Sequence, residues 1–351
     1  MGERLLLRGN EVIAEAAIRA GCQCYFAYPI TPQAELLEHM AWHMPRLGRT
    51  FVQAESEIAA ISMVYGAAAT GVRTMTSSSS PGISLKQEGI SYLAGSNLPA
   101  VIVNIVRGGP GLGNIAPSQC DYFQATKGGG HGDYRLIVLG PSTVPEAGEL
   151  TMLAFDLADQ YRIPVLILAD GMLGQMMEPV ELPDPVDVAS LPAKEWALTG
   201  ATGREPNVIH SFDMDPEGLR QINRDLQAKY ARIAENETRY EAMEAEDADI
   251  VLAAYGTIAR IGKSVVRMAR AEGIKLGLFR PITLWPFPSD PLRDLADRVE
   301  TVLTVEMSAG QMWEDVRLAV AERAETPFYG ETGGVVPTPR SILSEVKKHV
   351  R

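Results

Sequence analysis

The sequence predicts an α/β protein with a parallel sheet covered by helices on both faces, followed by a smaller second α/β domain. Short, continuously apolar runs are typical of buried parallel strands, and they occur at 24–27, 74–76, 100–106, 136–139 and 164–169. Segments with helical character separate these runs, and this alternation indicates a parallel sheet. A second strand–helix pattern begins at Ile250.

Capping residues and glycine stops place the helices of the first part. They are expected at 11–20, 32–43, 57–69, 81–94, 118–126 and 143–161. Asn10 is expected to cap the first helix and Ser56 the third, since both side chains can accept hydrogen bonds from free amide groups. Pro32 is expected in the first turn of the second helix.

The chain changes character between the two α/β patterns. Prolines interrupt residues 178–206, and a polar segment with apolar residues at helical spacing follows Asp215. We therefore divide the chain into a first domain at 1–180, a proline-rich arm and polar helical linker at 181–247, and a second domain at 248–351. In the second domain, strands are expected at 250–255, 275–279 and 301–306, and helices at 258–271, 311–323 and 341–349.

Composition argues against several functional classes. The 351 residues carry 32 Lys and Arg against 44 Asp and Glu, a formal charge of −12, so neither nucleic acid nor a membrane is an expected partner. The longest apolar runs are far shorter than the roughly 20 residues of a membrane-spanning helix. The 3 cysteines do not make a disulfide framework, which favours a cytoplasmic protein, and they are too few to hold an iron–sulfur cluster on thiolates alone.

The candidate functional residues lie where predicted strands or apolar segments end. Four segments stand out, at 28–32, 55–57, 77–82 and 107–114. Because ligands bind beyond the carboxyl ends of parallel strands, we expect these segments to line one site.

Each segment also has an ordinary structural explanation. Thr31 can cap the helix that follows it, and Glu57 is favoured by the helix dipole in a first turn. Residues 108–113 contain no complete dinucleotide fingerprint. Arg107 is the most informative residue, because its guanidinium fork matches a carboxylate or a phosphate and the glycines after it allow close approach. A free-standing α/β protein that binds a phosphorylated ligand at Arg107 to Gly113 is therefore one interpretation.

Taken together, these segments resemble the alpha subunit of 2-oxoacid:ferredoxin oxidoreductases. The resemblance rests on Tyr28-Pro29-Ile30-Thr31-Pro32, Glu55-Ser56-Glu57-Ile58-Ala59-Ala60, residues 76–82 and residues 107–113. Residues 124–134 and 169–175 are most similar to the branched-chain (3-methyl-2-oxobutanoate) branch, and the similarity runs through essentially the whole chain. It implies a pyrimidine-type thiamine-diphosphate-binding domain over 1–180 and a transketolase C-terminal-like domain over 248–351.

The resemblance also implies a reaction and roles for particular residues. A 2-oxoacid and coenzyme A would give an acyl-CoA, carbon dioxide and reduced ferredoxin. Glu57 matches the catalytic glutamate that bonds the aminopyrimidine nitrogen of thiamine diphosphate. Substrate binding is assigned to Tyr28, Ile30, Thr31 and Arg107, and cofactor binding to Glu57, Ser79 and Pro81.

Half of the expected cofactor site is missing from the sequence. Thiamine enzymes anchor the diphosphate through Mg²⁺ with a Gly-Asp-Gly segment and an Asn roughly 25 to 30 residues later, and this chain has only Ala169-Asp170-Gly171. We assign no metal ligand here and expect a beta subunit to carry the diphosphate and Mg²⁺ site. By the same resemblance, gamma and ferredoxin-like delta subunits would supply the [4Fe-4S] clusters.

Two further interpretations remain open at this stage. The enzyme type could be the same but act on 2-oxoglutarate or pyruvate. Alternatively, the chain could be a non-catalytic assembly subunit, in which case Glu57 would have no part in turnover.

Overall fold

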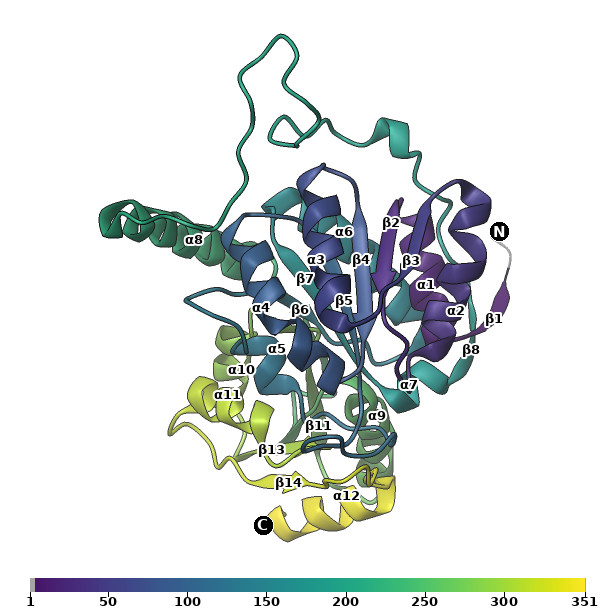
Figure 1. Ribbon diagram of the computed structural model, residues 1–351. Coiled ribbons are helices and arrows are strands. Elements are labelled where there is room, and N and C mark those ends of the chain that lie inside the picture. Colours follow the sequence, from purple (N-terminus) through teal and green to yellow (C-terminus); the bar gives the residue numbers. More distant parts are fainter. Residues whose placement is uncertain (1–3, 351) are drawn as a thin grey trace.

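The computed structural model describes residues 4–350 and contains two main sheets (Figure 1). The first has seven strands in the order β12-β6-β7-β5-β4-β2-β3, and every strand except β12 runs parallel to its neighbours. The strands are β2 (Cys24–Ala27), β3 (Thr50–Gln53), β4 (Thr74–Ser78), β5 (Ala100–Val106), β6 (Ile137–Leu139), β7 (Pro164–Asp170) and β12 (Thr283–Trp285). All residues of β4, β5 and β7 are buried, as expected for strands covered on both faces.

Helices cover both faces of this sheet. Apolar side chains of α3 and α4 pack against one face, and those of α1, α2 and α6 pack against the other. The helices are α1 (Gly9–Arg19), α2 (Ala34–His43), α3 (Glu57–Ala69), α4 (Pro81–Gly95), α5 (Tyr122–Thr126), α6 (Val144–Tyr161) and α7 (Gly171–Gln175).

The second sheet has five strands in the order β14-β13-β10-β11-β9. Only β9 is antiparallel, at one edge. The strands are β9 (Tyr240–Met243), β10 (Ile250–Ala253), β11 (Leu276–Pro281), β13 (Thr301–Glu306) and β14 (Phe328–Gly330), and the helices are α9 (Gly256–Ala271), α10 (Ser289–Ala296), α11 (Gln311–Val320) and α12 (Pro339–Val346). The predicted class, a parallel-sheet α/β domain followed by a smaller one, is confirmed.

The connecting segments lie outside the two sheets. A small antiparallel pair joins β1 (Leu5–Arg8) to β8 (Met177–Val180). The arm that follows loops away from the first sheet and leads into α8 (Pro216–Asn236), which projects from the body in Figure 1. No helix within residues 4–350 is long and apolar enough to cross a membrane.

The predicted helix starts hold for one helix and fail for two. Ser56 caps α3 as predicted, because its Oγ accepts a hydrogen bond from the amide of Ala59. Asn10 does not cap α1; it is buried inside the helix, and its Nδ2 donates to the Pro32 carbonyl and to Glu35, both at 2.8 Å. Pro32 lies before α2, which begins at Ala34. The Asn10 side chain is thus used for a tertiary contact that local sequence does not reveal.

The helix predicted at 118–126 is also too long. Only Tyr122–Thr126 is helical. The residues before Tyr122 are not helical because they contact the loops that follow strands of the second sheet. Gln119 Nε2 donates to the Tyr255 carbonyl at 2.9 Å, and Gln119 Oε1 accepts from the Met307 amide at 2.9 Å. Tyr255 and Met307 follow β10 and β13, so Gln119 fills the gap between the ends of two neighbouring strands.

Candidate functional site

Arg107 joins two of the predicted loops at the carboxyl edge of the first sheet. The residue follows β5 directly and is buried. Its guanidinium donates to the Thr31 carbonyl at 3.0 Å and to the Leu112 carbonyl at 3.1 Å. The loop after β2 and the glycine loop after β5 therefore meet at one side chain, as the sequence predicts.

Ser80 connects the loop after β4 to the same place. Its Oγ accepts from the Arg107 amide at 3.0 Å, and its own amide donates to Asn104 Oδ1 at 3.0 Å. Ser80 has a φ of 25°, a conformation that non-glycine residues rarely adopt. Neighbours on β5 hold this strained residue at the turn into α4, and strain of this kind is concentrated at functional sites.

Glu57 is the first residue of α3 and is buried. Its carboxyl group lies against Gly82 in the first turn of α4. A methyl group at Gly82 would lie 2.6 Å from Glu57 Oε1 and 2.1 Å from Ser78 Oγ, so any side chain larger than hydrogen would collide with both. The backbone of α4 thus comes close to the carboxyl group because residue 82 is a glycine.

Several polar atoms at this edge are buried without a partner. Within the described residues, Ser78 Oγ, Ser79 Oγ and Arg107 Nε have no hydrogen-bonding partner. Buried polar groups are nearly always satisfied, so a cluster of unsatisfied ones indicates a place for a ligand. All three belong to the ends of β4 and β5, beside Glu57 and Thr31.

The remaining predicted substrate residues lie in the loop after β2. Tyr28 and Thr31 are exposed, and Ile30 is half-buried. The buried side chain of Gln33 links this loop to β4, because its Oε1 accepts a hydrogen bond from Ser77 Oγ at 2.6 Å. Gln33 lies in the region that the sequence predicts to set the size of the substrate pocket. Asn104 was not among the predicted site residues, because a single polar side chain in a strand carries no distinctive sequence signal.

The glycine loop is closed on itself. The amide of Asn114 donates to the Gly108 carbonyl at 2.9 Å, and the amide of Gly108 donates to the Ala116 carbonyl at 2.9 Å. These two amides are therefore satisfied within the loop and do not form an open cradle for a phosphate. This arrangement gives no support to the interpretation of a free-standing protein that binds a phosphorylated ligand at this loop.

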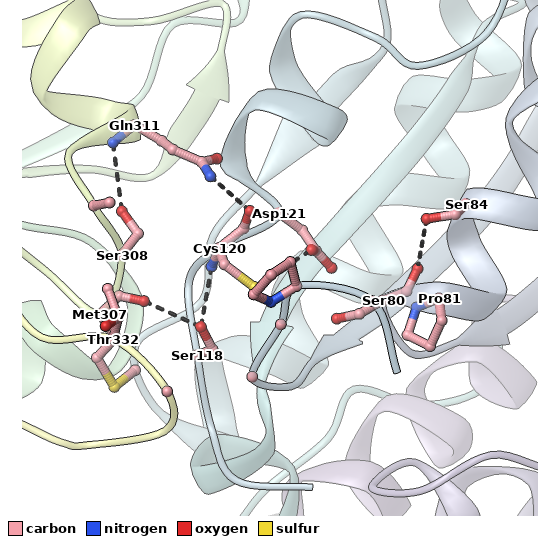
Figure 2. Close-up of a pocket in the computed structure, with 16 residues that line it drawn as sticks. Ser80, Pro81, Ser84, Ser118, Cys120, Asp121, Met307, Ser308, Gln311 and Thr332 are labelled. Atoms are coloured by element: carbon pink, nitrogen blue, oxygen red, sulfur yellow. Dashed lines mark hydrogen bonds between the residues drawn. The ribbon is translucent and has the colours of Figure 1, made fainter. Parts of the chain in front are cut away.

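A cavity of about 740 Å³ lies between this loop and the second sheet. In Figure 2, Ser80, Pro81 and Ser84 lie on one side of it, and Met307, Ser308 and Gln311, which follow β13, lie on the other. Cys120 lies between them, and its Sγ donates to the Arg107 carbonyl at 3.3 Å. Burial, together with the charge of Asp121, raises the pKa of the Cys120 thiol. Pro81, a predicted cofactor residue, lines this cavity, whereas Glu57 does not.

The described part of the chain shows no group of three or more His, Cys, Asp or Glu side chains that could hold a metal ion. Burial raises the pKa of Cys22 to about 12, so this residue stays a neutral thiol in the core. Cys22 packs in the apolar core on the α1 and α2 side of the first sheet.

The fold and this edge define an α/β protein with a candidate ligand site at the carboxyl ends of a parallel sheet. Residues 15–249 match the family described as pyruvate flavodoxin/ferredoxin oxidoreductase, thiamine diphosphate-binding, and residues 248–342 match pyruvate:ferredoxin oxidoreductase core domain II. The chain belongs to this family, which confirms the resemblance seen in the sequence.

The names of similar proteins are consistent with this family. The chain is 53% identical to the ketoisovalerate oxidoreductase subunit VorB of Methanothermobacter marburgensis, covering 98% of this chain and 97% of the relative. It is 37% identical to the 2-oxoglutarate synthase subunit KorA of Methanothermobacter thermautotrophicus, covering 99% of both chains.

Two solved structures share the fold. The 2-oxoglutarate:ferredoxin oxidoreductase of Magnetococcus marinus, with 2-oxoglutarate, coenzyme A and succinyl-CoA bound, is 27% identical with a TM-score of 0.89. All of this chain aligns, and it spans 66% of that longer chain. A split-gene transketolase, described as an inactive beta4 tetramer, matches 99% of this chain and 98% of its own at 14% identity and a TM-score of 0.61, which shows a common fold.

Proposed function

We propose that this chain is the alpha subunit of a multi-subunit, thiamine-dependent 2-oxoacid:ferredoxin oxidoreductase that acts on branched-chain 2-oxoacids. The observation that carries the proposal is the placement of Glu57, buried at the start of α3 against Gly82 and on the same sheet edge as the Arg107–Thr31 contact. Family membership supports the enzyme type. The 53% identity to a ketoisovalerate oxidoreductase subunit supports the branched-chain substrate over 2-oxoglutarate and pyruvate.

The residues at this edge fit the aminopyrimidine end of thiamine diphosphate. Glu57 offers a carboxyl group that would share a proton with a ring nitrogen, and its burial keeps water from competing for that proton. Ser79 Oγ is buried and unpartnered, which suits a hydroxyl reserved for a ligand. Pro81 begins α4 beside it and would shape the same wall. The bound cofactor supplies the electron sink for decarboxylation, and this chain positions it.

Arg107 is suited to hold the carboxylate of the 2-oxoacid. Two of its guanidinium nitrogens are tied to the Thr31 and Leu112 carbonyls, and Nε is buried without a partner in the described part of the chain. A fixed guanidinium binds a carboxylate with less loss of entropy than a free side chain. Tyr28, Ile30 and Thr31 would line the substrate from the loop after β2.

A second subunit has to complete this site. We propose a beta subunit that carries the diphosphate and Mg²⁺, with gamma and delta subunits that hold [4Fe-4S] clusters and pass electrons to ferredoxin. Large apolar side chains are exposed around the edge, on Ile58, Leu85, Leu112 and Ile115. Apolar residues gathered in this way fit a surface that a partner covers. The free thiols of Cys22, Cys24 and Cys120 agree with a cytoplasmic complex.

The test is to co-express the chain with its candidate partner subunits and to assay the purified complex with coenzyme A and a viologen acceptor. We expect acceptor reduction with the highest kcat/KM for 3-methyl-2-oxobutanoate, compared with 2-oxoglutarate and pyruvate. A higher kcat/KM for 2-oxoglutarate would overturn the substrate assignment. Absence of reduction with all three acids would contradict the enzyme assignment.

The isolated chain provides the matching control. It should show negligible thiamine diphosphate binding by calorimetry, and binding should appear when the beta subunit is added. Tight binding by the chain alone would contradict a shared site.

A further inference from the structure

Lys86 is a fully buried lysine that the proposed function does not use. It lies in α4 with 0% of its surface exposed, and its Nζ donates to Thr76 Oγ1 at 2.7 Å and to the Ser77 carbonyl at 2.9 Å. A buried lysine is expensive, because the ammonium group loses its hydration. The two hydrogen bonds satisfy the buried amino group and fix its position beside β4.

The position of Lys86 relates it to Glu57. Lys86 follows Gly82 by four residues in α4, so the two lie on the same side of the helix. Gly82 is the residue against which Glu57 Oε1 packs. Both acceptors of the lysine, in Thr76 and Ser77, belong to β4, which ends at Ser78; the hydroxyls of Ser78 and of the next residue, Ser79, are unpartnered.

The electrostatics of Lys86 point to the same carboxyl group. Burial lowers the pKa of Lys86 to about 7, and among the described residues the negative charge of Glu57 opposes that change. Tyr25 on β2 is hydrogen-bonded to Ser77 Oγ at 2.6 Å, so it lies next to one of the residues that Lys86 contacts. Burial raises the pKa of Tyr25, so its phenol is neutral and adds no charge. Glu57 is thus the acidic group to which this cation responds.

We propose, on the basis of the function proposed above, that Lys86 is a positioning residue that acts through Glu57. Its ammonium group lies one helical turn from the point where Glu57 packs against Gly82 and favours the ionised carboxylate through its charge, while its two hydrogen bonds hold the end of β4 in place. Lys86 touches neither substrate nor cofactor. Its effect is on the readiness of Glu57 to accept and return a proton.

The experiment compares Lys86→Met with Lys229→Met in the reconstituted complex. Lys229 is a second buried lysine, on α8, bonded to Asn97 Oδ1 and the Arg162 carbonyl and remote from the site. We expect Lys86→Met to lower kcat about tenfold or more and to move the acid side of the kcat–pH profile upward by about one pH unit. The KM for the 2-oxoacid should change less than about threefold, because the Arg107 contact is intact.

A readout independent of turnover is the dissociation constant of thiamine diphosphate, measured by calorimetry on the same complexes. We expect Lys86→Met to weaken binding several-fold, and Lys229→Met to leave binding, kcat and the pH profile as in the unaltered complex. If the two variants behave alike, Lys86 only anchors α4 to β4 and the inference is wrong.

A second pair of variants covers the case in which Lys86→Met does not assemble. Lys86→Arg keeps the charge, and Lys86→Gln keeps hydrogen bonding without charge. We expect the arginine variant to retain more activity than the glutamine variant, with a pH profile nearer to that of the unaltered complex. Equal activities and profiles would overturn the role of the charge. An inactive unaltered complex would instead contradict the proposed function.

Discussion

The guanidinium of Arg107 donates a hydrogen bond of 3.0 Å to the carbonyl of Thr31, 76 residues earlier in the chain. The same group donates to the Leu112 carbonyl. Arg107 thus ties the loop after β2 to the glycine loop after β5, and its Nε is buried without a partner among the described residues. In the proposed function, this one side chain would both position the two loops and bind the substrate carboxylate.

The first prediction concerns Arg107→Lys. A lysine keeps the charge but has one nitrogen, so it cannot hold both loops and also bind a carboxylate in two-point fashion. We expect the KM for 3-methyl-2-oxobutanoate to rise about 10- to 100-fold, with a smaller change in kcat. Steady-state kinetics of the complex measure this. Arg135→Lys, whose side chain bonds to carbonyls away from the site, is the control and should match the unaltered complex. An unchanged KM for Arg107→Lys would remove it from substrate binding.

The second prediction concerns Gly82→Ala. The added methyl group would meet Glu57 Oε1 at 2.6 Å and Ser78 Oγ at 2.1 Å, so the carboxyl group has to move. We expect turnover to fall about tenfold or more, together with a loss of about 1–3 kcal/mol in the free energy of unfolding.

The matched control is Gly66→Ala in α3. A methyl group there meets nothing within 4 Å. The substitution should leave turnover unchanged and stabilise the helix by about 0.5–1 kcal/mol. If Gly82→Ala is as active as Gly66→Ala, the close packing of Glu57 against α4 is irrelevant to catalysis.

The third prediction concerns pH and Glu15, which links α1 to the helix after the substrate loop. A hydrogen bond from His39, together with Arg19 and against the opposing effect of burial, lowers the pKa of Glu15 from 4.5 to about 2. Above pH 4.5 the carboxylate is ionised in both states and its stabilisation is complete. As the pH decreases from 4.5 to 2, the unfolded chain takes up a proton that the folded chain does not. The free energy of unfolding therefore decreases as the pH decreases.

Glu15→Gln should therefore cost about 1–3 kcal/mol at pH 7 and cost progressively less as the pH falls below 4.5. Urea unfolding at several pH values measures this difference. A difference between the two proteins that is constant from pH 7 to pH 3 would contradict the assigned ion pairs.

The fourth prediction concerns the surface around the site. Ile58 is exposed in α3, one residue after Glu57. If a beta subunit completes the site, Ile58→Asp places an unpaired charge in the contact and should weaken assembly about tenfold or more. Size-exclusion chromatography of the co-expressed complex checks this. Leu318→Asp, at an exposed apolar position on α11 in the second sheet region, is the control. Equal assembly of both variants would place the partner elsewhere.

Much of the site follows from local sequence. Apolar strands ending in unusual loops, and the rule that parallel strands end at one edge, were enough to place Thr31 near Arg107 and both near the loop after β4. Ser56 could be predicted as the cap of α3 because capping depends on residues three apart. These features are local or follow from topology.

The rest depends on contacts between distant parts of the chain. Asn10 has the sequence of a cap but bonds to Pro32 and Glu35 instead. Gln119 lies in a segment with helical character, but its side chain bonds the ends of β10 and β13. The edge strand β12 comes from the second part of the sequence and pairs with β6 of the first sheet. Propensity cannot reveal such partners, because they come together only when both sheets are formed.

Lys86 shows the same limit at the site itself. In sequence it is one lysine in a helix, where a charged side chain normally faces solvent. Its burial follows from the closeness of β4 and α4, and its relation to Glu57 becomes visible only through Gly82.

The central claim is that this chain contributes the carboxyl group that works on the aminopyrimidine of thiamine diphosphate. Glu57→Gln in the reconstituted complex tests it most directly, because the amide keeps the size of the side chain but cannot share a proton in the same way. With the assembly and the KM for the 2-oxoacid retained, we predict that kcat falls at least about 100-fold. A complex that assembles normally and turns over at the unaltered rate would contradict the account and favour a non-catalytic assembly subunit.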